Sequence, residues 1–226
     1  MRHCLDTVMF FCAGRGTRML ELTQHQPKPM INVAGRPLID HAVDAMGDIP
    51  RQFANLHYQP EILEKHLKLA GIEPIFETDL LETGGGLKHA LPLLDRDAVF
   101  TMNTDAVWSG PAPAEFLRMH WNPNIMDGLL LLIPKANAVG HKGSGDFLRA
   151  IDGTLLRGAG DVYTGLQVIK TKYVAEIEQS HFSLNMAWET LLTRRTLYGA
   201  IYSGHWCDVG YPDAIPLAES MLEIHS

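Results

Sequence analysis

The sequence predicts an α/β protein whose mainly parallel sheet is covered by helices on both faces. Apolar runs of strand length recur, several alternate with helix-period stretches, and a chain of 226 residues that is 46% hydrophobic can bury one substantial core. The strand-length runs span residues 8–13, 53–57, 74–77, 98–103, 129–134, 163–169 and 199–203. We therefore expect a single domain over residues 1–226.

Helix-period stretches separate the first four runs. Apolar residues recur at Leu38, Ala42 and Met46, and similar patterns cover residues 62–70 and 87–94. Two later patterns cover residues 184–194 and 214–222, and the last is expected to pack the C-terminus onto the domain. After residue 129 the alternation weakens, and the glycine-rich segment 134–146 is expected to be a mobile loop.

Composition excludes several classes of protein. The 19 basic and 26 acidic residues give a net charge of −7, which does not suit nucleic acid or an anionic membrane. The three cysteines form no Cys-x-x-Cys pair, so neither a disulfide framework nor a zinc site is indicated. No stretch approaches the roughly 20 apolar residues of a membrane span. We expect a soluble, cytoplasmic protein with no nucleic-acid or membrane partner.

The segment FCAGRGTRMLELTQHQPKPM, at residues 11–30, has the composition of a phosphate-binding loop. It continues the first apolar run with Gly14 and Gly16, then Arg18, and ends with Lys28 between two prolines. Glycine lets backbone N–H groups approach an anion, which the cations neutralise. The first 40 residues of this acidic chain hold five Lys or Arg against three Asp or Glu. The sequence therefore predicts nucleotide binding here.

Two better-known glycine loops are excluded. Only one residue separates Gly14 from Gly16 and the next lysine is Lys28, so the segment is not a Walker-type loop. Met19 stands where a dinucleotide fingerprint requires its third glycine, which argues against NAD and an oxidoreductase. The alternative for the two glycines alone is a tight turn that binds no ligand.

Two aspartates are candidate ligands for Mg²⁺. Asp105 follows the buried-type run 98–103, so its carboxylate is expected at a strand end, where parallel sheets bind ligands. Asp208 stands between apolar residues in HWCDVG, where a carboxylate is costly to bury without a partner. Nucleotide-bound Mg²⁺ takes one or two protein carboxylates. The alternative is that each aspartate caps a helix or turn, but the pair beside a cationic loop favours the metal.

Residues 81–94, LETGGGLKHALPLL, predict a glycine-rich turn that opens an amphipathic helix. Backbone without side chains at a helix start lets a flat or anionic group approach, so the segment is a candidate for contact with a nucleobase or ribose. Thr83 as an N-cap is compatible with this role.

Together these motifs carry a family resemblance. AGRGTRM, PKP, INVAGRPLID, LLETGGG, NTD and HWCDVG occur in the order and approximate spacing of the sugar-1-phosphate nucleotidyltransferases, from residue 8 to about residue 220. The chain most resembles the compact bacterial branch of N-acetylmuramate-1-phosphate uridylyltransferases and proteins labelled mannose-1-phosphate guanylyltransferase. The resemblance implies a Rossmann-like fold of the nucleotide-diphospho-sugar transferase type, with a nucleotide-binding half over about 1–128 and a small sugar-binding lobe within about 129–226.

The resemblance also implies roles for individual residues. The residues implied to contact the nucleotide are Ala13, Gly14, Gly16, Thr17, Arg18, Lys28, Thr83, Gly84 and Gly85. Among them, Arg18 and Lys28 are the implied catalytic residues, with Lys28 beside the α-phosphate or the sugar phosphate. Asp105 and Asp208 would hold Mg²⁺, the implied cofactor. Asp146, in a GDF segment, and Thr164, in a YTG segment, would contact the sugar.

The implied reaction is direct attack of a sugar 1-phosphate on a nucleoside triphosphate, which gives pyrophosphate and a nucleotide-sugar for cell-wall or polysaccharide synthesis. The motifs do not choose between uridylyl and guanylyl transfer, nor do they identify the sugar or the oligomeric state. The chain departs from the family pattern at Cys12, where alanine is usual, and at Thr104, where glycine is usual. The alternative function is a non-catalytic sensor of nucleotides or nucleotide-sugars with the same fold.

Overall fold

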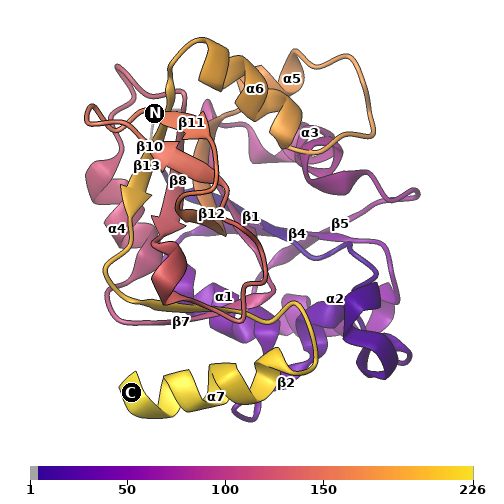
Figure 1. Ribbon diagram of the computed structural model, residues 1–226. Coiled ribbons are helices and arrows are strands. Elements are labelled where there is room, and N and C mark those ends of the chain that lie inside the picture. The colour runs from indigo at the N-terminus through magenta and orange to yellow at the C-terminus, as the bar shows by residue number, and fades with distance from the viewer. Residues whose placement is uncertain (1–4, 226) are drawn as a thin grey trace.

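The computed structural model describes residues 5–225 and joins all seven predicted strands in one sheet, in the order β13-β8-β12-β6-β1-β4-β5 (Figure 1). Only β12 runs antiparallel to its neighbours, so the prediction of a mainly parallel sheet is confirmed. The strands are β1 (Thr7–Phe11), β4 (Arg51–Leu56), β5 (Glu73–Phe76), β6 (Ala98–Asn103), β8 (Gly128–Ile133), β12 (Val162–Lys170) and β13 (Leu197–Ile201).

Helices cover both faces of this sheet, as predicted (Figure 1). One face carries α1 (Leu38–Met46), α2 (Pro60–Leu69) and α4 (Pro113–His120), and the other carries α3 (Glu82–Leu94), α5 (Lys172–Ala175) and α6 (Asn185–Thr193). Because side chains alternate along a strand, Val8 and Phe10 of β1 enter the first core while Met9 enters the second. The central strands are therefore buried on both sides.

A smaller sheet lies beside the main one and consists of β7 (Ala106–Ser109), β14 (His205–Asp208) and β9 (Ala138–Val139). The C-terminal helix α7 (Ala214–His225) packs on it, which confirms the expected docking of this helix (Figure 1). The segment 134–146 is not wholly a loop, because it contains η3 (Lys135–Asn137) and β9, and β9 pairs with β14.

The remaining elements are short. They are the 3-10 helices η1 (Thr17–Thr23) and η2 (Lys28–Met30), the β2 (Asn32–Val33) and β3 (Arg36–Pro37) pair, and the hairpin of β10 (Phe147–Arg149) and β11 (Leu155–Arg157). Among the helices of residues 5–225, none has the length and apolarity needed to span a membrane. Cys12 and Cys207 are buried free thiols, and Cys4 lies outside the described residues.

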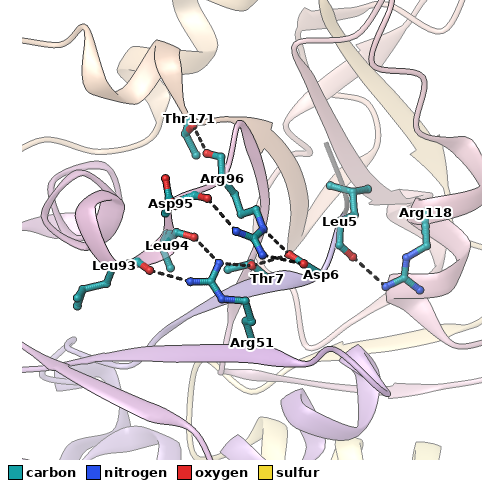
Figure 2. Close-up of polar contacts among 10 residues, drawn as sticks. All are labelled: Leu5, Asp6, Thr7, Arg51, Leu93, Leu94, Asp95, Arg96, Arg118 and Thr171. Atoms are coloured by element: carbon teal, nitrogen blue, oxygen red, sulfur yellow. Dashed lines mark hydrogen bonds and ion pairs between the residues drawn. The ribbon is translucent and has the colours of Figure 1, made fainter. Parts of the chain in front are cut away.

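A polar cluster closes the amino-terminal end of the sheet (Figure 2). Asp6, just before β1, accepts two hydrogen bonds from the Arg96 guanidinium, at 2.8 and 2.9 Å. Arg51, the first residue of β4, donates to the carbonyl oxygens of Leu93 and Leu94 at the end of α3. These bonds fix α3 and the first strands at the amino-terminal end of the sheet. The cluster therefore lies opposite the carboxyl ends of the strands.

Candidate active site

A cleft of about 440 Å³ lies at the carboxyl ends of β1, β4 and β6. These ends lie together because Phe11 of β1 pairs with Asn55 on one side and Asn103 on the other. The predicted nucleotide residues that line the cleft are Ala13, Gly14, Gly16, Thr17, Arg18, Lys28 and Thr83, joined by the predicted metal ligand Asp105.

The two glycines of the loop serve different purposes. Gly16 has a left-handed φ of 61°, and a Cβ there would lie 2.8 Å from the Lys28 Cβ, so this glycine lets the loop pack against the Lys28 segment. A Cβ on Gly14 would meet nothing within 4 Å, so the backbone there borders open space in the cleft. Gly14 thus has the exposed backbone that a phosphate needs, while Gly16 shapes the turn.

Lys28 is an anchored cation. Its Nζ donates to Asp105 Oδ2 at 2.7 Å, and its side chain is only 12% exposed. The flanking Pro27 and Pro29 restrict the backbone on both sides, and the Ile31 N–H closes the short η2 turn on the Lys28 carbonyl. The ammonium group is therefore placed at the cleft before any ligand arrives.

The two predicted metal ligands converge. Asp208 ends β14 and pairs in register with Ala106, the residue after Asp105, and the Val209 N–H donates to the Asp105 carbonyl at 2.8 Å. Burial raises the pKa of Asp208, the negative charge of Asp105 raises it further, and Lys28 and Arg18 act in the opposite direction. The two carboxylates therefore lie within electrostatic range of each other.

This donor set fits Mg²⁺. Two neighbouring carboxylates repel each other and supply the hard oxygen ligands that this ion prefers, while phosphate oxygens and water complete its coordination. Over residues 5–225, no group of three or more His, Cys, Asp or Glu side chains is arranged to hold a metal by itself. A metal that arrives with a nucleotide is consistent with this pair.

Tyr211 is a site residue that sequence reasoning missed. The Arg18 guanidinium lies over its ring, 5.1 Å from the centroid, and Lys142 Nζ lies 4.1 Å from the same centroid. A hydrogen bond to Tyr211 raises the pKa of Arg18, and the charges of Asp105 and Asp208 add to this shift. The one available signal was the position of Tyr211, three residues after Asp208.

The backbone N–H groups of Gly84 and Gly85, which are predicted to lie at the base, are used within the protein. Both N–H groups donate to the Phe182 carbonyl at 2.9 Å, so neither is free for a ligand. A Cβ on Gly84 would lie 2.4 Å from the Phe182 ring, and one on Gly85 would lie 2.1 Å from the Ser180 carbonyl oxygen. These glycines allow α3 to pack against the chain that precedes α6. Thr83 lines the cleft, but it lies inside the helix, and the N-cap is Leu81.

A second cavity of about 270 Å³ adjoins the first, since Thr83, Asn103 and Ser183 line both. Asp146, a predicted sugar residue, lines it and accepts the Tyr163 N–H at 2.9 Å. The other lining residues are Phe147, Arg157, Tyr163, Leu184, Asn185 and Trp188.

Thr164, the other predicted sugar contact, lies inside the protein. Its side chain is buried, at 2% exposure, and its hydroxyl donates to the Leu131 carbonyl at 2.7 Å. Side chains alternate along β12, so Tyr163 reaches the second cavity and Thr164 points away from it.

The two departures from the family pattern lie against each other. The Thr104 hydroxyl donates to the Phe11 carbonyl at 2.9 Å, and Cys12 Sγ lies 3.8 Å from Thr104 Oγ1. Both side chains are buried. Thr104 therefore ties β6 to β1 and directs its hydroxyl to the backbone.

Comparison with known proteins agrees with this geometry. Residues 8–134 match the family described as the MobA-like NTP transferase domain. The chain is 34% identical over 98% of its length to the N-acetylmuramate alpha-1-phosphate uridylyltransferase of Caulobacter vibrioides, and it covers 99% of that protein. It is 27% identical over 90% of its length to mannose-1-phosphate guanyltransferase 2 of Candida glabrata, of which it covers 61%.

A solved structure supports the fold. The inositol-1-phosphate CTP transferase from T. maritima matches with a TM-score of 0.80 at 15% identity, over 99% of this chain and 98% of that one. The chain therefore belongs to the MobA-like NTP transferase family, among its sugar-1-phosphate nucleotidyltransferases, as its motifs predicted.

Proposed function

We propose that this chain transfers a nucleotidyl group from a nucleoside triphosphate to a sugar 1-phosphate and releases pyrophosphate. The observation that carries the proposal is that Lys28, Arg18 and Asp105 line one cleft. Asp208 lies within electrostatic range of all three. That cleft opens onto a second cavity of a size to take the sugar.

The reaction needs no nucleophile from the protein. A phosphate oxygen of the sugar 1-phosphate attacks the α-phosphorus in line, the bond to the β-phosphate oxygen breaks, and pyrophosphate leaves with the electron pair. Both reactants are anions, so Lys28 and Arg18 act by offsetting their repulsion and stabilising charge on the transferred phosphoryl group. Asp105 and Asp208 would hold Mg²⁺, which adds charge neutralisation at the phosphates when it is bound.

The choice of base and sugar follows from the relatives of this chain and from the second cavity. The Caulobacter protein at 34% identity makes UTP and N-acetylmuramate 1-phosphate the first pair to test. Arg157 lines the second cavity and would be a cationic partner for the lactyl carboxylate of this sugar. Asn185 and Glu189 hold its guanidinium at 2.7 and 2.9 Å. The product would be a cell-wall precursor, made in the cytoplasm where nucleoside triphosphates are available.

A substrate matrix tests the proposal. Each of the four nucleoside triphosphates is combined with a panel of sugar 1-phosphates that includes N-acetylmuramate, N-acetylglucosamine, mannose and glucose, and pyrophosphate release is measured. We expect Mg²⁺-dependent turnover for one preferred pair. No product from any pair, together with nucleotide binding that does not depend on Mg²⁺ in calorimetry, would support the sensor instead.

A further inference from the structure

A chain of buried hydrogen bonds lies in the wall of the cleft at the carboxyl ends of β1 and β4. The Asn55 side chain, at the end of β4, accepts the Cys12 N–H at 2.7 Å and donates to Glu77 Oε1 at 2.7 Å. Glu77 Oε2 accepts the Leu81 N–H at 3.2 Å. The carboxylate therefore links the start of the glycine loop, through Asn55, to the turn that opens α3.

Both side chains are inside the protein and face the cleft. Asn55 is 3% exposed and Glu77 is 5% exposed, and each lines the cleft together with Cys12. The backbone of Glu77 is also fixed, because its N–H donates to the Leu56 carbonyl and its own carbonyl meets His57 Nδ1 at 3.0 Å. A buried carboxylate is costly without donors, and here neutral donors meet each oxygen.

The third glycine of the GGG run makes room for this pair. A Cβ on Gly86 would lie 2.6 Å from Glu77 Oε1 and 2.8 Å from Asn55 Nδ2. Glu82, which follows Leu81 and lines the cleft, has a left-handed φ of 61° that a non-glycine residue rarely adopts. The contact from Glu77 to Leu81 therefore lies next to a strained turn at the wall of the cleft.

We propose that Asn55 and Glu77 are positioning residues that set the distance between the two walls of the nucleotide cleft. Through Cys12 they orient Ala13 and Gly14, and through Leu81 they orient the turn that carries Glu82 and Thr83. The inference rests on the proposed function, because it assigns the cleft to the nucleoside triphosphate. Loosening the pair weakens nucleotide binding more than sugar-phosphate binding, since most of the second cavity is built from other segments.

A reciprocal exchange tests this role. Asn55→Asp places two carboxylates face to face. Glu77→Gln leaves one mismatch in either orientation of the new amide, because its NH₂ faces the Asn55 NH₂ in one orientation and the Leu81 N–H in the other. Turning the Asn55 amide over does not help, because its NH₂ would then face the Cys12 N–H. The double variant restores the match: the new aspartate accepts from Cys12 and from the new glutamine, whose oxygen accepts the Leu81 N–H. It also keeps the buried charge of the original pair.

The readouts are KM for the nucleoside triphosphate, KM for the sugar 1-phosphate, kcat, nucleotide Kd by calorimetry and thermal unfolding. We expect each single variant to raise the nucleotide KM and Kd about tenfold, the effect of one lost hydrogen bond, and the double variant to return within about threefold of wild type. The sugar-phosphate KM should change less than about threefold in all variants.

Several outcomes would overturn the role. Folded single variants with wild-type nucleotide KM and Kd would overturn it. A folded double variant whose nucleotide KM and Kd are no closer to wild type than those of the single variants would also overturn it. If the single variants do not fold, Glu77→Asp, which keeps the charge but shortens the reach, should show the same nucleotide-specific loss, and a wild-type Kd in that variant overturns the role. Because Kd needs no turnover, wild-type protein that binds nucleotide without reacting contradicts the proposed function alone.

Discussion

Lys28 Nζ and Asp105 Oδ2 lie 2.7 Å apart and join the amino-terminal loop to a strand end 77 residues further along the chain. The contact keeps the ammonium group at the cleft and partly neutralises a carboxylate that lies near the charge of Asp208. In the proposed reaction, a nucleotide with its metal ion would offer both groups new partners. The pair would therefore preorganise a cation and an anion for opposite parts of one ligand.

Replacing Lys28 should strongly reduce the rate of catalysis without unfolding the protein. In Lys28→Met we expect kcat to fall by about 100-fold to 1,000-fold, because a preorganised charge beside the reacting phosphates is lost. Pyrophosphate release measures the effect, and circular dichroism checks the fold. Lys65→Met, at an exposed position on α2, is the matched control and should react at the wild-type rate. A near-normal rate in Lys28→Met would remove the assigned role.

Asp105→Asn and Asp208→Asn should each weaken the response to Mg²⁺. Asparagine keeps the shape but removes the negative charge, so we expect the Mg²⁺ concentration at half-maximal rate to rise about tenfold or more. The neighbouring exposed Asp213→Asn should leave the Mg²⁺ curve unchanged. Chelation with EDTA should stop the wild-type reaction. An unchanged curve in both site variants means that the carboxylates do not hold the metal.

The main sheet was predictable because its central strands are buried on both sides. Such strands read as continuous apolar runs, as in GLLLLI of β8, and every one of these runs joined the sheet. The strands of the smaller sheet were not predicted. β9 has two residues and β7 and β14 have four each, and their pairing depends on contacts between distant segments. Helix α4 was also missed, since a helix of eight residues carries only a short apolar pattern, here buried at Pro113, Ala114 and Leu117.

The candidate site was predictable where chemistry selects the residue type. A cationic glycine loop and two aspartates predicted phosphate and metal, and the β7–β14 pairing places Asp105 next to Asp208. The surroundings of Gly84 and Thr164 were not predictable, because they depend on which segments face these residues. Gly84 resembles Gly14 in sequence, but the first meets Phe182 and the second meets open space. Thr164 lies beside Tyr163, and strand alternation turns it away from the cavity.

Two glycine substitutions should therefore affect different properties. In Gly85→Ala, a Cβ would lie 2.1 Å from the Ser180 carbonyl oxygen, so we expect a loss of about 1 to 3 kcal/mol in the free energy of unfolding. Gly14→Ala meets no atom within 4 Å and should unfold at the wild-type temperature. Its added methyl group lies at the cleft, so we expect the nucleotide KM to rise. Urea unfolding and steady-state kinetics of both variants measure these effects, and equal stability of the two would contradict the packing account.

Substitutions at the two predicted sugar residues, Asp146 and Thr164, should likewise affect different properties. Asp146→Asn alters a side chain of the second cavity, and we expect the sugar-phosphate KM to rise about tenfold with little change in the nucleotide KM. Thr164→Val removes a buried hydroxyl that bonds to Leu131, so we expect a stability loss of about 1 kcal/mol and an unchanged sugar-phosphate KM. A specific rise in sugar-phosphate KM in Thr164→Val would instead support its predicted contact with the sugar.

The Asp6–Arg96 pair at the other end of the sheet should stabilise the fold in a pH-dependent way (Figure 2). The hydrogen bond from Arg96 holds the pKa of Asp6 below its ordinary value of 3.8, although burial opposes this. A carboxyl group with a lowered pKa in the folded state contributes its full stabilisation above the ordinary value and loses it as the pH falls through the lowered one. Asp6→Asn should therefore cost about 1 to 2 kcal/mol near pH 7, and this difference should shrink below about pH 4.

Urea unfolding of wild-type protein and Asp6→Asn between about pH 7 and about pH 3 measures this difference. The matched control is Asp44→Asn, which breaks a 2.7 Å contact with Arg36 in which both side chains are about half exposed or more. An exposed ion pair contributes little, so this control should change the free energy of unfolding by less than about 0.5 kcal/mol at any pH. If the Asp6→Asn difference stays constant or grows as the pH falls, the charge of Asp6 is not what stabilises this end of the sheet. If the loss of unfolding free energy caused by Asp6→Asn shrinks as the pH falls, and Asp44→Asn shows no such change, the stabilisation belongs to the ionised, partly buried pair.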